Sequence, residues 1–261
     1  MIISRTNPKI KNIKKLQKSS KARKEAKVFL VEGSKMVLEA PKNQMIECYC
    51  SESFFNRYKE KVEGLGCSYE IVSDELLHFI SDTKNPQGIL GVIKQRDYTL
   101  EEILIKKSPL LLILESIQDP GNLGTIFRTA EAAGATGILM DKDCADIYNP
   151  KTIRSTMGAI YRLPHTVFFD TEETIKKIKE AGVCLFATDL KAEKRFDKED
   201  YRSATAFIIG NEGKGLSNFT MNLADKAVKI PMEGKAESLN VAIATSLLVF
   251  EAFRQRGFYS E

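Results

Sequence analysis

The sequence lacks the features of a metal protein, a membrane protein or a disulfide-rich protein. It contains two histidines and five cysteines, and no two cysteines form a CxxC pair. Structural zinc sites use clustered Cys and His ligands, so we expect no metal. No uninterrupted apolar run approaches the roughly 20 residues that a membrane-spanning helix needs, and we expect no membrane partner. An odd number of scattered thiols is typical of a reducing compartment, which predicts a cytoplasmic protein.

Two common nucleotide-binding motifs are also absent. The apolar segment LLLILE at 110–115 is followed by the turn ESIQDPGNLG rather than by GxGxxG, and no GxxxxGK[ST] segment occurs. The sequence therefore lacks the main motif evidence for binding of a nicotinamide, a flavin or a P-loop nucleotide.

Positive charge is concentrated at the start of the chain. Residues 1–27 hold ten basic residues and one acid, Glu25, and residues 101–261 are slightly acidic. Release of counterions from a phosphate backbone would favour such a basic block, whereas a lysine-rich solvated helix face is the alternative. Composition by itself leaves both open.

Hydrophobic periodicity predicts two α/β domains joined by a charged linker. Residues 1–95 alternate between helices and short apolar strands, which indicates a small α/β domain. We expect its helices at 9–26, 34–40, 53–66 and 74–82, and its strands at 28–33, 45–50, 67–73 and 89–95. Residues 96–108 are charged and weakly apolar, so we interpret them as the linker.

The second domain, residues 109–261, has stronger apolar runs. They are typical of strands buried on both faces of a parallel sheet with a doubly wound α/β arrangement. We expect strands at 110–115, 137–141, 165–169, 183–188, 206–210 and 227–230, and helices at about 122–133, 150–159, 171–181, 215–223 and 240–256.

Three glycine-containing segments follow strand ends in this second domain. They are IQDPGNLGTIFRTAEAAGA at 117–135, IIGNEGKGLS at 208–217 and IPMEGKAESLNVAIATSLLVFEAFRQR at 230–256. In this order and spacing they closely resemble motifs 1, 2 and 3 of the SpoU (TrmH-like) family of RNA ribose methyltransferases. Upstream, TKNPQGILGVI at 83–93 and NPKIKNIKKLQKSSKARKEAKVFLVEG at 7–33 resemble the substrate-binding domain of that family.

The resemblance implies a fold and a reaction. The fold is a small N-terminal RNA-binding α/β domain and a parallel-sheet SPOUT domain with a trefoil knot, which breaks the rule that chains do not knot. The reaction is 2′-O-methylation of ribose in structured RNA, with S-adenosylmethionine as methyl donor. We expect the RNA to be ribosomal RNA of the 23S type. A tRNA substrate, or an RNA-binding protein without catalysis, are the alternatives. Housekeeping modification and antibiotic resistance are both open.

The resemblance also assigns site residues. It implies catalytic roles for five residues in the three motifs, namely Asn122, Arg128, Glu212, Ser238 and Asn240. It implies that the donor contacts Thr188, Gly210, Glu212, Gly213, Ile230, Met232 and Leu239. Family members have been suggested to use the arginine as a base, but a guanidinium has a pKa above 12 and normally only donates. We therefore favour positioning and charge stabilisation for Arg128.

One departure from the family's motif and one property of the last helix bear on the prediction. Where many members read SLNVS, this chain reads SLNVA, so Ala242 removes one possible hydroxyl contact. The final helix, residues 240–256, is apolar around most of its circumference and must be buried on nearly all sides. The resemblance implies that this helix contributes to a homodimer interface.

Overall fold

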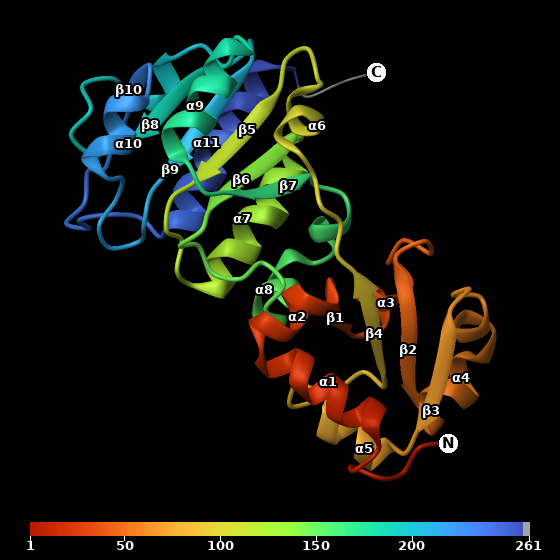
Figure 1. The fold of residues 1–261 in the computed structure, drawn as a ribbon. Helices are drawn as coiled ribbons and strands as arrows, with labels where there is room; N and C mark the ends of the chain where they lie inside the picture. Colours follow the sequence, from red (N-terminus) through yellow and green to blue (C-terminus); the bar gives the residue numbers. More distant parts are fainter. Residues whose placement is uncertain (258–261) are drawn as a thin grey trace. The chain divides into compact units, whose positions relative to one another are not determined.

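A computed structural model describes residues 1–257, and these residues form two compact units (Figure 1). The first unit contains Met1–Arg96 together with Asp146–Tyr161, and the second contains Asp97–Ala145 with the residues from Arg162 onward. The chain therefore leaves the second unit after Ala145 and returns to it at Arg162. No helix among the described residues is long and apolar enough to cross a membrane.

The first unit is built on a mixed four-stranded sheet with the strand order β1-β4-β2-β3. Strand β4 pairs antiparallel with β1 and β2, whereas β2 and β3 are parallel. The strands are β1 (Val28–Glu32), β2 (Met45–Ser51), β3 (Ser68–Val72) and β4 (Ile89–Lys94). The helices are α1 (Pro8–Lys18), α2 (Ser20–Ala26), α3 (Ser34–Leu38), α4 (Glu52–Glu63), α5 (Asp74–Ile80) and α8 (Pro150–Thr156).

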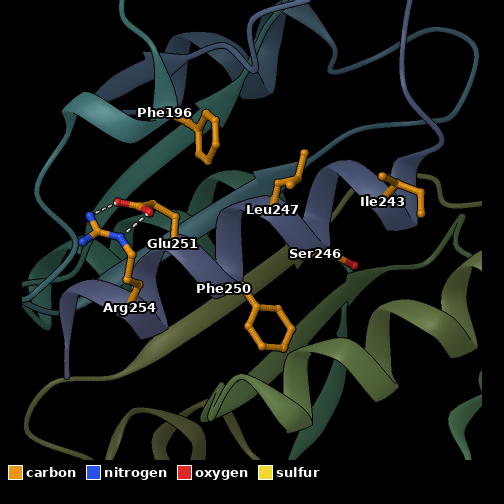
Figure 2. A pocket seen from close by; sticks show the side chains of 7 residues that line it. All are labelled: Phe196, Ile243, Ser246, Leu247, Phe250, Glu251 and Arg254. Carbon is orange, nitrogen blue, oxygen red and sulfur yellow. Dashed lines mark hydrogen bonds and ion pairs between the residues drawn. The ribbon is translucent and has the colours of Figure 1, made fainter. Parts of the chain in front are cut away.

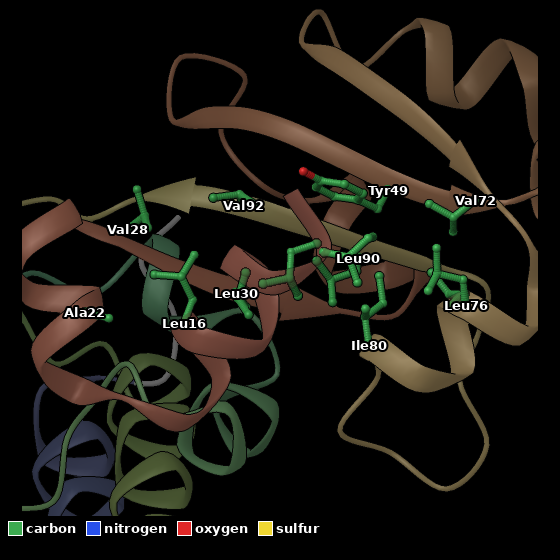
Figure 3. Packing of buried hydrophobic residues seen from close by; sticks show 13 residues of the cluster. Leu16, Ala22, Val28, Leu30, Tyr49, Val72, Leu76, Ile80, Leu90 and Val92 are labelled. Carbon is green, nitrogen blue, oxygen red and sulfur yellow. The ribbon is translucent and has the colours of Figure 1, made fainter. Parts of the chain in front are cut away.

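The apolar side of α1 packs on this sheet. Ile10, Ile13 and Leu16 are fully buried and lie in one cluster with Tyr49 of β2 and Leu90 of β4 (Figure 3). Spacings of three residues place these α1 side chains on one face of the helix, so its lysines must lie on the others. This is why the basic residues of α1 are at the surface.

The prediction of one long helix over residues 9–26 is wrong, because the structure has two helices there. Ser19 is extended, with φ −117° and ψ 111°, and its hydroxyl accepts a hydrogen bond from the N–H of Ala22. The serine is thus the N-cap of α2, and it ends α1 before the periodic pattern ends. All the expected strands are present with ends that differ by at most two residues.

Residues 146–161 are held to the first unit by a buried ion pair. The Arg23 side chain is 3% exposed; it donates to the carboxylate of Asp146 and to the carbonyls of Leu16 and Gln17. An unpaired guanidinium would be costly to bury, so Asp146 and these carbonyls are needed together. Helix α8 then packs against β1.

The second unit contains a six-stranded sheet in which every pairing is parallel, in the order β10-β8-β9-β5-β6-β7. This confirms the parallel α/β sheet. The strands are β5 (Leu110–Leu114), β6 (Gly137–Asp141), β7 (His165–Phe168), β8 (Cys184–Thr188), β9 (Thr205–Ile209) and β10 (Lys226–Val228). The helices are α6 (Leu100–Leu104), α7 (Pro120–Ala132), α9 (Thr171–Glu180), α10 (Asn218–Leu223) and α11 (Val241–Gln255).

The segment expected to be a linker contains a helix of this unit. Thr99 and Glu102 form a capping box at the start of α6, and Ile103 is buried in the core with Ile113 of β5 and Ile178 of α9. On the other side of the sheet α7 and α11 pack against each other. The trefoil knot that the family resemblance implies stays a prediction.

Candidate functional site

Helix α7 begins at a site where its first turn meets a carboxylate from a distant loop. Asp119 caps the helix by accepting from the N–H of Asn122 at 2.8 Å, and Pro120 occupies the first turn, where no N–H is needed. The side chain of Asn122 is thereby placed at the carboxyl end of β5. Parallel strands bring their carboxyl ends to one edge, so the loop after β9 reaches the same place.

The loop after β9 is folded tightly on itself. A Cβ at position 210 would lie 2.3 Å from the carbonyl carbon of Gly215, so only glycine fits there. Asn211 and Gly215 exchange backbone hydrogen bonds of 3.0 and 2.9 Å. The Asn211 Oδ1 atom accepts from the N–H groups of Gly213 and Lys214. These bonds fix the backbone of the loop and therefore the direction in which the Glu212 side chain leaves it.

The Glu212 carboxylate joins this loop to the start of α7. It accepts from the N–H groups of Gln118 at 3.2 Å and Asp119 at 3.1 Å, and from Asn122 Nδ2 at 3.2 Å. Burial raises the pKa of Glu212, but hydrogen bonds from its own N–H, from Asp119 and Gln118, and from the Asn122 amide outweigh it and lower the pKa overall. The side chain is therefore ionised at neutral pH.

Asn240 extends the same chain of hydrogen bonds. Its Oδ1 caps α11 by accepting from the N–H groups of Ala242 and Ile243, and its Nδ2 donates to Asn122 Oδ1 at 3.0 Å. Backbone N–H groups and an ionised carboxylate leave no freedom in which end of each amide is oxygen. One chain of hydrogen bonds, in which every donor and acceptor is defined, thus joins Glu212, Asn122 and Asn240. These residues are far apart in the sequence.

A further cluster supports this chain, and the sequence analysis missed it. Ser116 has φ 56°, which is unusual for a residue other than glycine, and its N–H and hydroxyl both donate to the Asp141 carboxylate. Its carbonyl accepts from Asn211 Nδ2 at 2.8 Å. Asp141 is the last residue of β6. An acidic residue at the end of an apolar strand was the sequence feature that could have identified it.

The other two residues expected to be catalytic are placed differently. Arg128 is exposed on α7, six residues after Asn122, and its guanidinium has no hydrogen bond or ion pair with the described residues. Ser238 is exposed and lies just before the cap of α11. The structure thus joins Asn122, Glu212 and Asn240 directly, and leaves Arg128 free for a ligand.

All seven residues expected to contact the donor line one pocket of about 500 Å³, and Ser238 lines it too. This size is in the range of ligand pockets. The walls come from the ends of β8, β9 and β10 and from the start of α11. Lining residues that the sequence analysis did not name include Asp189, Leu190, Lys191, Lys214 and Asn218. The first three follow Thr188 directly, so the strand end was the signal for them.

Among residues 1–257 there is no group of three or more His, Cys, Asp or Glu side chains that could hold a metal ion.

Comparison with known proteins assigns both parts of the chain. Residues 109–250 match the SpoU rRNA Methylase family, and residues 7–91 match the MRM3-like substrate binding domain. The chain is 34% identical over 250 residues to the 23S rRNA (guanosine(2553)-2′-O)-methyltransferase RlmP of Bacillus subtilis, across 95% of this chain and 97% of that relative.

Solved structures agree over nearly the whole length. The AdoMet-bound rRNA methyltransferase from Sinorhizobium meliloti has a TM-score of 0.87 and 32% identity, and the match covers 97% of both chains. The SpoU methyltransferase AviRb from Streptomyces viridochromogenes, in complex with the cofactor AdoMet, has a TM-score of 0.88 and 27% identity, with 96% of this chain and 98% of that chain covered.

Replacement of Glu212 tests the hydrogen-bond chain. Glu212→Gln should lower the free energy of unfolding by about 1–3 kcal/mol at pH 7.5, because an amide NH₂ would face N–H donors. Glu193→Gln is the matched control, since Glu193 is exposed and has no hydrogen bond or ion pair with the described residues. It should change stability by less than about 0.5 kcal/mol. Urea unfolding measures both, and equal effects would contradict the assignment.

The difference in unfolding free energy between wild type and Glu212→Gln should depend on pH. The pKa of Glu212 is lowered by folding, so its contribution is present above the ordinary carboxyl pKa and is lost as the pH falls through the folded value. The difference between wild type and Glu212→Gln should therefore shrink below about pH 4.

Proposed function

We propose, because the chain belongs to the SpoU rRNA methylase family, that it transfers a methyl group from S-adenosylmethionine to a ribose 2′-hydroxyl of ribosomal RNA. One observation carries the proposal: the seven residues expected at the donor line a single pocket, and Glu212 belongs both to that pocket and to the chain with Asn122 and Asn240. The donor pocket and the polar site therefore share a wall.

The pocket suits a cationic donor with an adenosine part. Bound S-adenosylmethionine supplies a methyl group on a positively charged sulfur. Leu190, Met232 and Leu239 offer apolar side chains, and the close packing at Gly210 leaves backbone groups at the wall. Among the charged residues that line the pocket, Lys191, Lys214 and Lys229 are cationic, so the carboxylates of Glu212 and Asp189 are the groups that can face the positive sulfur.

The polar site then has to orient the ribose rather than activate it. Methyl transfer is an in-line displacement, and its rate depends chiefly on alignment of the hydroxyl oxygen with the methyl carbon. Asn122 and Asn240 hold each other in one orientation. Ser238 lies two residues before Asn240 in the sequence. Arg128 has an exposed guanidinium that can pair with a phosphate or the ribose oxygen and stabilise negative charge as the proton leaves.

A tRNA substrate and a non-catalytic RNA-binding role are the competing functions. A protein that only binds RNA has no need for a 500 Å³ pocket lined by the donor residues beside an oriented polar chain. The substrate-binding domain at residues 7–91 and the rRNA enzyme among the relatives favour ribosomal RNA over tRNA. Such a reaction would take place in the cytoplasm, where the five free thiols stay reduced.

Arginine substitutions test the division between donor and RNA sites. Arg128→Ala should lower methyl transfer to unmodified 23S rRNA by about 100-fold, the effect of losing one charge-stabilising donor. The dissociation constant for S-adenosylmethionine should change by less than a few-fold, because Arg128 does not line the pocket. Arg128→Lys should recover only part of the activity, since an ammonium lacks the planar fork.

Filter assays with labelled donor measure transfer, and calorimetry measures donor binding. Turnover close to wild type in Arg128→Ala would show that this arginine has no part in the reaction. A wild-type protein that binds no S-adenosylmethionine, even with RNA present, would refute the methyltransferase and favour the binding protein.

The second proposal is that two copies of the chain pair through α11. Ile243, Leu247 and Phe250 lie at helical spacing, are 40–53% exposed and, with Phe196, line a groove of about 430 Å³ (Figure 2). The Glu251 carboxylate pairs with Arg254 at one end of the groove. A second copy is the occupant that fits, because a two-fold axis would bring the same apolar stripe against itself. The resemblance to a family of homodimers points to the same occupant.

A charge in the groove tests the dimer. Leu247→Glu should convert a dimer into a monomer, because an unpaired carboxylate would be buried at the interface. Sedimentation equilibrium gives the mass of each protein. Ile105→Glu is the control, since Ile105 is apolar and 83% exposed in the same unit but lies outside the groove. Wild type that sediments as a monomer would refute this interface.

The third proposal is that the outer face of α1 neutralises RNA phosphates. Lys9 pairs with Glu47 and Glu70, and Lys14 donates to the carbonyl of Phe79, so these two lysines are already used. Lys11, Lys15 and Lys18 are at the surface, lie along one face, and make no side-chain hydrogen bond or ion pair with the described residues. They form the free part of the basic block on α1.

Neutralisation of this face tests the RNA role of α1. Replacement of Lys11, Lys15 and Lys18 by Gln should weaken RNA binding and reduce the log–log salt slope by roughly 0.7–0.9 for each phosphate that is no longer neutralised. Lys9→Gln should have a smaller effect, because its charge is already paired with two carboxylates. Filter binding across a salt series decides this, and an unchanged slope in the triple variant would leave α1 as a solvated surface.

A further inference from the structure

The loop between α5 and β4, residues 81–88, is tied to the end of β1 by side-chain hydrogen bonds. The Glu32 carboxylate accepts from the N–H of Asp82 at 3.0 Å and from the hydroxyl of Thr83. Gln87 Oε1 accepts from the Ser34 N–H at 2.9 Å and from the Ser34 hydroxyl at 3.1 Å. The loop contains the PQG segment, for which the methyl-transfer reaction assigns no role.

The backbone of this loop is also fixed. Gly88 has φ 86°, and a Cβ there would lie 2.9 Å from the Cβ of Phe54 and 3.1 Å from Ser51 Oγ. The Ser51 N–H donates to the Gly88 carbonyl, and the Gly33 N–H donates to the Ile89 carbonyl. Glycine is therefore required at 88, and the backbone that directly follows Gln87 is fixed.

These bonds determine which end of the Gln87 amide faces outward. A backbone N–H can only donate, so the atom that Ser34 contacts must be the oxygen. The NH₂ group must point away from Ser34. Gln87 is exposed, and its nitrogen has no acceptor among the described residues. Two hydrogen-bond donors are thus presented to solvent on a side chain that has little freedom left to lose.

The charges around Gln87 favour a partner rich in acceptor oxygens. Lys84 is exposed and unpaired within the described residues, and Lys35 is exposed with only a 4.0 Å contact to Glu39. The nearby acids are used internally, since Glu32 accepts from the loop and Asp82 pairs with Arg154. The surface therefore offers donors and positive charge.

We propose that Gln87 is a specificity-determining residue for RNA, with its NH₂ group donating to a base oxygen of the substrate while Lys84 and Lys35 neutralise neighbouring phosphates. The inference rests on the proposed function, because it names how that RNA is recognised. The lysines of α1 are flexible point charges that attract any phosphate backbone. A held amide NH₂ group donates only to an oxygen at one position, and it loses little side-chain entropy in doing so.

A single substitution separates this role from that of a structural clamp. Gln87→Glu keeps an oxygen for Ser34 and so keeps the loop, but replaces the outward donors with a carboxylate oxygen. With full-length protein and unmodified 23S rRNA transcribed in vitro, filter binding should show an affinity at least about tenfold lower. Thermal unfolding and the affinity for S-adenosylmethionine should stay at wild-type values.

Two matched variants complete the experiment. Asn85→Asp places the same new charge on the same exposed loop, two residues away, and should weaken binding much less. Ser34→Ala keeps the backbone hydrogen bond and the outward NH₂ group, so it should bind RNA nearly as well as wild type.

The outcomes are distinct. RNA affinity that is unchanged in Gln87→Glu, or equally reduced in Asn85→Asp, would overturn the role of Gln87 and leave the proposed function intact. Wild-type protein that neither binds nor methylates the transcript would overturn the proposed function and this inference with it.

Discussion

The site depends on how the Glu212 carboxylate is satisfied. A half-buried ionised carboxylate is costly unless it accepts hydrogen bonds, and its partners are two backbone N–H groups before α7 and the amide of Asn122. These bonds fasten the loop after β9 to the loop after β5. The orientation of Asn122 follows, and through it that of Asn240, so a single charge organises two helix starts and one pocket wall.

The contacts of α11 on its different sides explain why this final helix has so few polar residues. Asn240 caps α11 and belongs to the polar chain, Ala242 and Leu248 are buried against the rest of the unit, and Leu247 lies in the apolar groove. One rigid helix thus links the candidate site to the face proposed for a second copy.

The two proposals for the first unit assign it two kinds of contact with RNA. The lysines of α1 are exposed because its apolar face, including Ile13, is needed in the core, which leaves flexible charges on the outside. Gln87 has the opposite character, since its oxygen is held by Ser34 and its nitrogen direction is thereby set. Affinity and positional selectivity can therefore come from different residues of one small domain.

Sequence by itself determined the local elements. Period-two and period-3.6 patterns located the strands and helices, because strand burial and cap chemistry are local properties. The residues of the Glu212 chain were named by the family resemblance of the three motifs. The sequence failed at Ser19, where a cap outweighed the helical period, and it offered no sign that Arg23 needs Asp146. Only the tertiary structure decided that pairing, the support of Ser116 by Asp141 and the direction of the Gln87 amide, because each depends on hydrogen bonds between residues distant in the chain.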